Sequence, residues 1–221
     1  MKPIVFSVDD SDYINKYDGT SHKIWNETTG PMLPLRASIR KHYLQQQGYK
    51  CAYCRMLKRE NHGLSWDVEH IIAKSAHPRF LFEPENLALA CKECNLSKLD
   101  QDVLTGALRP QAFYPRDKES YKIIHPHYDK YEDHMEIAHF SGKVIYMPKN
   151  KHKGRETFIM CNLLRFSYEY GEWKDFSYAI TKKVSDFLNS CAPDATPQEI
   201  SKFLGTINFT INPDFAENFA P

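Results

Sequence analysis

One segment near the start of the chain has apolar residues at helical spacing. It runs over residues 35–47, and Gly48 follows it. Its apolar residues are Leu35, Ile39, Tyr43 and Leu44. Such spacing places side chains on one helix face, and glycine commonly ends a helix. We therefore predict one helix, which leads the chain into Cys51.

Other patterns predict a small mixed core between irregular segments. Residues 1–34 combine polar and apolar positions without a period and predict an irregular arm with one short strand at Ile4–Ser7. The stretch WDVEHII, Trp66–Ile72, is typical of a strand, and CNLSKLDQDVL, Cys94–Leu104, is typical of a helix. A strand, a connection and a helix thus make up the predicted core.

The second half of the chain predicts a hairpin followed by helices. Residues 105–156 are rich in Pro, Tyr, His and Lys, and HFSGKVIYM predicts a β-hairpin around Ser141 and Gly142. Further helices are expected at Glu156–Tyr170, Asp175–Ser190 and Pro197–Leu204. We expect an α+β protein in three segments: an arm and helix at 1–48, a core at 49–104, and a mainly helical extension at 105–221.

Composition indicates a folded chain without a strong overall charge. Hydrophobic residues make up 42% and charged residues 26%, as in ordinary globular domains. The net charge is +1, which by itself does not indicate a nucleic-acid-binding protein. No apolar run reaches the roughly 18 residues of a membrane span, and the first residues do not resemble a secretory signal. We expect a cytoplasmic location and no membrane partner.

Four of the six cysteines form two C-x-x-C pairs, Cys51 with Cys54 and Cys91 with Cys94. In a reducing compartment such pairs favour metal binding over disulfides. Four thiolates satisfy the tetrahedral preference of zinc and leave no coordination position open, which is typical of a structural site. A redox role is less favoured, because it needs one pair and leaves the second unexplained.

Between and beside these pairs stand Asp67-Val-Glu69-His70, then Asn86, then Asn95-Leu-Ser-Lys98. Together they resemble the HNH endonuclease family over about residues 40–104. The resemblance implies a ββα-metal fold. In that fold an acidic residue and a histidine stand on a strand, an asparagine follows in the next loop, and another asparagine opens the helix.

The resemblance assigns the central roles to His70, Glu69 and Asn95. A neutral imidazole, whose ordinary pKa is near 6.5, deprotonates water as a general base. Glu69 and Asn95 would bind a catalytic Mg²⁺ or Mn²⁺, and Asp67 is an alternative carboxylate ligand on the same strand face. Neighbours on a strand point to opposite faces, so Glu69 and His70 can share a site only at a bend or at the strand's edge.

Two further residues have supporting roles. Asn86 is expected to brace the loop through backbone hydrogen bonds so that the His70 ring is correctly aimed. Lys98 lies one helical turn after Asn95 and is expected to contact a substrate phosphate, although a solvated lysine is the ordinary alternative.

These residues predict hydrolysis of a nucleic-acid phosphodiester that leaves a 5′ phosphate and a 3′ hydroxyl. DNA is the favoured substrate, and RNA stays open because an RNA nuclease would use the same residues. The alternative is a non-catalytic zinc module that binds nucleic acid or protein. Such a module would need the four cysteines but not Glu69, His70 and Asn95.

Segments outside the core carry a second resemblance. HPHYD at 125–129, GKVI at 142–145 and CNLLRFSYEY at 161–170 are similar to segments of the HNH subunits of bacterial antiphage systems such as Septu and some retron operons. This resemblance implies an effector nuclease of a defence complex. Its expected protein partner is an ATPase that senses infection and licenses cleavage.

Overall fold

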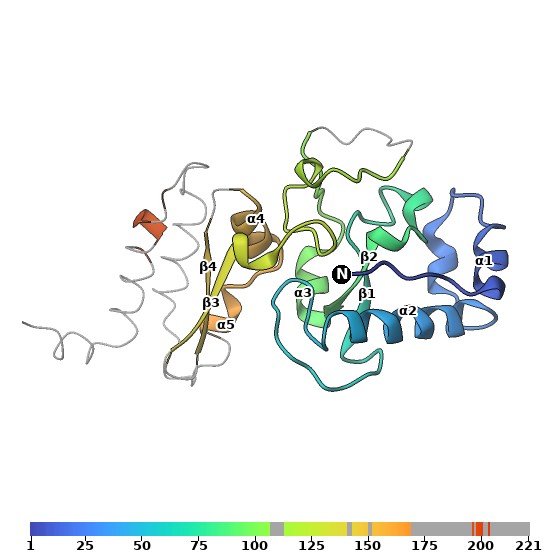
Figure 1. Ribbon diagram of the computed structural model, residues 1–221, viewed down its shortest axis with the longest axis horizontal. Helices are drawn as coiled ribbons and strands as arrows, with labels where there is room; N and C mark the ends of the chain where they lie inside the picture. The colour runs from blue at the N-terminus through green and yellow to red at the C-terminus, as the bar shows by residue number, and fades with distance from the viewer. Residues whose placement is uncertain are drawn as a thin grey trace, which may run out of the picture.

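The computed structural model describes residues 1–106, 113–140, 143–149 and 152–168, with 196, 198–200 and 203. They form a mixed α and β structure with two antiparallel two-stranded sheets, which confirms the expected α+β class (Figure 1). The helices are α1 Val8–Ile14, α2 Met32–Gln46, α3 Lys92–Lys98, α4 Lys153–Met160 and α5 Arg165–Tyr168. The strands are β1 Trp66–His70, β2 Leu87–Cys91, β3 Met135–Phe140 and β4 Lys143–Pro148.

Helix α2 confirms the helix predicted over residues 35–47, although it begins three residues earlier, at Met32. Its buried side chains are Met32, Leu35, Ile39, Tyr43 and Leu44. Gly48 follows the helix with φ +57°, the left-handed conformation that glycine adopts without strain. The helix packs its apolar face on β1 and β2, beneath the predicted site.

Strands β1 and β2 pair antiparallel, from Trp66 opposite Cys91 to His70 opposite Leu87. β1 ends at His70, two residues before the predicted end, because the chain bends at residues 71–72. β2 is fully buried. The amide of Gln47 completes its outer edge, since Oε1 accepts from Leu89 N at 2.7 Å and Nε2 donates to Leu89 O at 2.9 Å. Gln47 thereby satisfies both buried backbone groups of Leu89 on this edge.

The N-terminal arm differs from the prediction. Ile4–Ser7 is not a strand, and helix α1 starts directly after Ser7, whose Oγ accepts a hydrogen bond from Asp10 N at 3.1 Å. A serine cap of this kind supplies a local reason for the helix that hydrophobic periodicity missed. A 3₁₀ turn at His22–Asn26 then buries Trp25 against the core.

Helix α3 is also shorter than predicted. It covers Lys92–Lys98 rather than Cys94–Leu104. Leu99 has φ +49°, a conformation that a helix cannot continue, and its N–H closes the last turn on Asn95 O at 2.8 Å. The chain therefore turns away after Lys98, which places Leu99 and Asp100 beside the cavity described below.

The predicted hairpin is confirmed by the pairing of β3 with β4, from Met135 opposite Pro148 to Phe140 opposite Lys143. Ser141 and Gly142, which join the strands, lie outside the described residues. The helix predicted over Glu156–Tyr170 is divided into α4 and α5 by a turn at residues 161–164. The helix predicted at Asp175–Ser190 lies outside the described residues. Of the helix predicted at Pro197–Leu204, residues 198–200 and 203 are described and are helical, and the other four lie outside the described residues.

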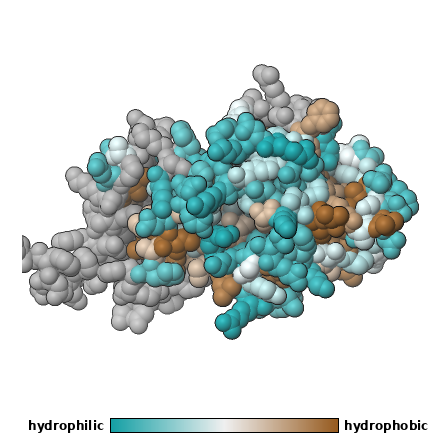
Figure 2. All heavy atoms as spheres, viewed as in Figure 1, coloured by the Kyte–Doolittle hydropathy of each residue, from teal (hydrophilic) through white to brown (hydrophobic). Residues whose placement is uncertain are grey.

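Polar side chains cover most of the described surface on the face seen in Figure 2, where apolar residues gather in small, separate groups. Large exposed apolar side chains include Val5, Val8, Leu64 and Phe113. Single exposed apolar residues are ordinary on protein surfaces. The candidate functional site is a polar cavity at the end of β1 rather than an extended apolar patch.

Candidate active site and metal centre

The four cysteines of the two C-x-x-C pairs meet in the core. The Sγ atoms of Cys51, Cys54, Cys91 and Cys94 all lie within 4.8 Å of one another, and all four residues are buried. Sγ of Cys54 lies 3.8 Å from Sγ of Cys91. This is close to the edge of a tetrahedron with Zn–S bonds of about 2.3 Å. The four residues therefore fit a zinc ion.

This cluster connects segments that are distant in sequence. Cys91 ends β2, and Cys94 lies in α3, one residue before Asn95. From the C-terminal extension, Arg165 Nη2 donates to Cys94 Sγ at 3.1 Å, and Tyr146 Oη donates to Cys54 O at 2.6 Å. The cluster thus holds the start of α3, and the extension packs directly on it.

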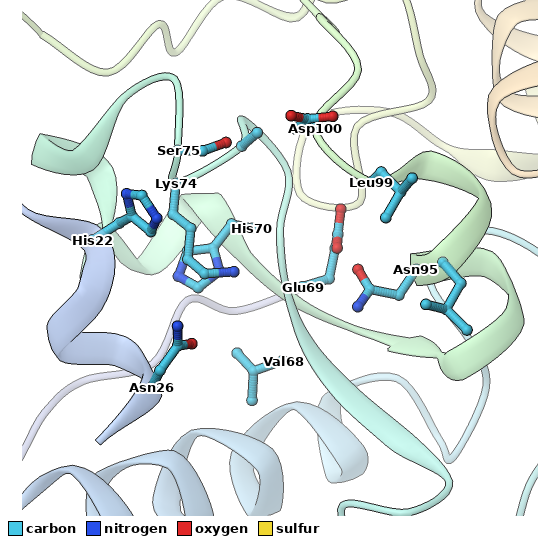
Figure 3. A pocket seen from close by; sticks show the side chains of 12 residues that line it. His22, Asn26, Val68, Glu69, His70, Lys74, Ser75, Asn95, Leu99 and Asp100 are labelled. Atoms are coloured by element: carbon cyan, nitrogen blue, oxygen red, sulfur yellow. The ribbon is translucent and has the colours of Figure 1, made fainter. Parts of the chain in front are cut away.

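A cavity of about 520 Å³ opens where β1 ends (Figure 3). It lies between β1, the loop that follows it, helix α3 and the 3₁₀ turn of the N-terminal arm. Its lining residues are His22, Asn26, Val68, Glu69, His70, Ala73, Lys74, Ser75, Asn95, Leu96, Leu99 and Asp100. Three of the predicted site residues, Glu69, His70 and Asn95, therefore share one cavity.

His70 is buried and oriented by backbone and aromatic contacts. Its Nε2 lies 3.1 Å from Leu81 O, and its ring meets Trp25 edge-on at a centroid distance of 4.5 Å. A carbonyl oxygen can only accept, so Nε2 donates and Nδ1 is left as the basic nitrogen. Burial, followed by the positive charge of Lys74, lowers the pKa of His70 to about 3. The imidazole is therefore neutral at neutral pH.

Glu69 is held by one of its two carboxylate oxygens. Tyr53 Oη donates to Oε1 at 2.9 Å, and Lys98 Nζ lies 2.7 Å from the same oxygen. Burial raises the pKa of Glu69, and the adjacent ammonium of Lys98 opposes that shift. No described residue donates to Oε2, which leaves that oxygen available to a cation at the cavity.

The structure gives Lys98 a role different from the predicted substrate contact. Its side chain is 0% exposed, and Nζ also donates to His70 O at 3.3 Å. An ammonium in this position cannot reach a phosphate without breaking a buried ion pair. Lys98 instead joins α3 to β1 by holding the Glu69 side chain and the His70 backbone.

Asp67 also differs from its predicted alternative role as a metal ligand. Its Oδ1 forms an ion pair with Lys92, and its Oδ2 accepts a hydrogen bond from Asn95 Nδ2 at 2.8 Å. Asp67 does not line the cavity. Because Asp67 holds the amide nitrogen, Asn95 presents its amide oxygen toward Glu69, as Figure 3 shows. Asp67 thus orients Asn95.

Glu69 and His70 are neighbours on a strand, and such neighbours point to opposite faces, yet both side chains line the same cavity. Their side chains lie on opposite sides of the β1 backbone in Figure 3. Since β1 ends at His70 and the chain bends immediately afterwards, the cavity is open to both sides of the strand end. A basic nitrogen and a carboxylate therefore face one volume.

Asn86 lies outside this cavity and is 0% exposed. Its Oδ1 accepts from Ile72 N at 2.7 Å, and its Nδ2 donates to Ile72 O and Phe80 O, both at 3.1 Å. These bonds connect the loop after β1 to the segment that carries Leu81, the hydrogen-bond partner of His70. The arrangement is the one that a bracing role requires.

Residues 51–101 match the family model described as HNH endonuclease. This segment is an HNH domain. It contains the four clustered cysteines together with Glu69, His70, Asn86 and Asn95. No curated protein and no solved structure matches the chain. At the level of the family, the match supports an endonuclease that binds nucleic acid.

In the part of the chain that the structure describes, no helix is both long and apolar enough to cross a membrane.

The cavity also contains residues that the sequence analysis did not single out. Lys74 and Asp100 belong to the HNH domain, and their polar character was the only sequence signal for a role. His22 comes from the N-terminal arm, outside the matched segment. No local pattern places His22 near His70, because the approach depends on the packing of Trp25 in the core.

We predict that Asn86→Ala destabilises the HNH domain. The substitution leaves Ile72 N–H, Ile72 O and Phe80 O without their partner, and each unsatisfied buried group costs about 1–3 kcal/mol. Urea denaturation should show the free energy of unfolding reduced by about 3 kcal/mol or more. Asn26→Ala, at an exposed cavity position, is the control and should change it by less than about 0.5 kcal/mol. Unchanged unfolding of Asn86→Ala would contradict the bracing role.

Proposed function

We propose that the protein is a metal-dependent endonuclease that hydrolyses nucleic-acid phosphodiester bonds, with DNA favoured as substrate. One observation carries the proposal. His70 is fixed through Nε2, which leaves Nδ1 as a proton acceptor, in a cavity also lined by Glu69 and Asn95. A carboxylate oxygen and an amide oxygen beside a neutral imidazole suit phosphodiester hydrolysis.

In the proposed reaction, His70 accepts a proton from the attacking water. The water oxygen forms a bond to phosphorus, the bond from phosphorus to the 3′ oxygen breaks, and that oxygen takes up a proton from solvent water to become the 3′ hydroxyl. Glu69 Oε2 and Asn95 Oδ1 would hold Mg²⁺ or Mn²⁺, since hard cations prefer oxygen ligands. When bound, the cation supplies positive charge at the phosphate and at the leaving oxygen. Lys98 and Asp67 keep the two proposed ligands in place.

We propose further that Cys51, Cys54, Cys91 and Cys94 hold a structural Zn²⁺. Their number, burial and mutual distances support this assignment. Four thiolates leave no open position for water, so the centre would stabilise the fold and take no part in the reaction.

Metal analysis of the purified chain should find one zinc per molecule. Cys91→Ala or Cys94→Ala should abolish zinc binding and the cooperative thermal transition, because a structural zinc supplies folding free energy. Cys161→Ala is the matched control. Cys161 is a buried cysteine that lies beside Cys94 but is not one of the four clustered cysteines, so this variant should keep one zinc. A Cys91→Ala variant that retained zinc and its thermal transition would contradict the assignment.

Cleavage of plasmid DNA should require added Mg²⁺ or Mn²⁺, and His70→Ala should lower its rate by about 10²- to 10⁴-fold, the usual contribution of a general base. Zinc content and thermal stability measured on the same sample report whether the fold is intact. His62→Ala is the control, because His62 is an exposed histidine of the HNH domain that does not line the cavity. Assays with a structured RNA in parallel distinguish the two substrate classes.

The non-catalytic alternative predicts a different outcome of this experiment. A zinc module that only binds nucleic acid or protein needs the four cysteines but makes no use of the His70 imidazole. If a folded, zinc-loaded His70→Ala protein cuts at the wild-type rate, or if the wild type does not cut with either cation, the proposed reaction is wrong and the zinc module replaces it.

We propose an effector role in antiphage defence, with an ATPase as the partner protein, on the resemblance carried by residues 125–129, 142–145 and 161–170. The net charge of +1 gives the isolated chain little attraction for a polyanion, so a partner that delivers the substrate would be needed. The isolated protein should therefore bind DNA weakly in a fluorescence anisotropy titration at physiological salt. Tight, sequence-selective binding by the chain alone would contradict a need for a partner.

A further inference from the structure

Two basic side chains line the cavity without an ion-pair partner among the described residues. They are Lys74, in the loop after β1, and His22, in the 3₁₀ turn of the N-terminal arm. Both side chains are partly buried. A lysine that gives up part of its hydration in a pocket is stabilised by an anion. The charge of Lys74 acts on Glu69 and lowers its pKa, but no described carboxylate forms a direct ion pair with Lys74.

The two basic residues lie on the His70 side of the cavity. Figure 3 shows Lys74 extending beside the His70 ring and His22 approaching from the arm. The pKa of His70 provides a second sign of this proximity, since the charges of Lys74 and His22 add to the lowering that burial causes. Both groups therefore act on the volume in which His70 would meet its substrate.

The opposite side of the cavity is acidic. Glu69, Asn95 and Asp100 lie across the β1 backbone from His70 and Lys74 in Figure 3. The ammonium of Lys98 is already bound to Glu69, so it adds no free positive charge there. The cavity thus has one side suited to a cation and another suited to an anion.

We propose that Lys74 and His22 form a phosphodiester-binding subsite that holds the non-bridging oxygens of the substrate phosphate beside His70. The ammonium of Lys74 donates to one oxygen and a ring N–H of His22 donates to another, opposite Glu69 and Asn95. The role in cleavage rests on the proposed function, whereas phosphate binding by the two residues does not. Because His22 lies outside residues 51–101, the N-terminal arm completes the site of the HNH domain.

Binding is tested on the full-length, zinc-loaded protein with dimethyl phosphate as the probe and no added magnesium. The ring resonances of His22 and His70 should shift on titration in NMR spectra. Lys74→Met should weaken the dissociation constant by about tenfold or more, as expected for loss of a charged hydrogen bond. Lys74→Arg should retain binding, and Lys41→Met, at an exposed position of α2, should leave it unchanged. Wild-type affinity in Lys74→Met, or no shift in the wild type, would overturn the subsite.

Steady-state cleavage separates this proposal from the proposed function. Lys74→Met and His22→Gln should lower kcat/KM by about tenfold or more with an unchanged thermal midpoint, and Lys74→Arg should restore much of the loss. If cleavage depends on His70 while Lys74→Met matches the wild type in both assays, the subsite is wrong and the nuclease function stands. If the wild type binds dimethyl phosphate through Lys74 but does not cleave, the subsite stands and the nuclease function is wrong.

Discussion

Lys98 and Glu69 form a buried ion pair between α3 and β1, and the arrangement of the whole cavity depends on it. Two charges so far from water are stable only together, because either alone would carry an uncompensated cost of burial. The pair fixes one carboxylate oxygen of Glu69 and leaves the other for the cavity. It also withdraws Lys98 from the substrate. In the proposed subsite, the positive charge that faces a phosphate comes instead from Lys74 and His22.

The cysteine cluster gives this ion pair its fixed geometry. Cys94 holds the first turn of α3, which carries Asn95 and Lys98, and Cys91 holds the end of β2, which pairs with β1. Arg165 donates to Cys94 from the C-terminal extension. A guanidinium beside a thiolate offsets part of the negative charge that four cysteines concentrate in the core. The described part of the extension therefore contributes to the centre that positions the cavity residues.

The cavity separates opposite charges over a short distance. A neutral imidazole stands between a carboxylate side and a basic side, and its own protonation is disfavoured by burial and by Lys74. Such a division suits a reaction in which a cation and a phosphate must approach each other while a base stays unprotonated. The aromatic packing of Trp25 against His70 connects the N-terminal arm to this arrangement, so residues far from the HNH domain in sequence shape its site.

The sequence alone determined the features that depend on local spacing. The sequence predicted the two C-x-x-C pairs, the helical face of α2, the β3–β4 hairpin and the HNH motif, because each follows from residue types at short, fixed intervals. Tertiary structure decided the rest. Whether Lys98 contacts Glu69 or solvent, whether Asp67 binds a cation or Asn95, and whether His22 reaches His70 depend on residues that lie 28 to 48 positions apart in the chain. Burial and charge pairing arise only once those segments pack together, so no local pattern could assign them.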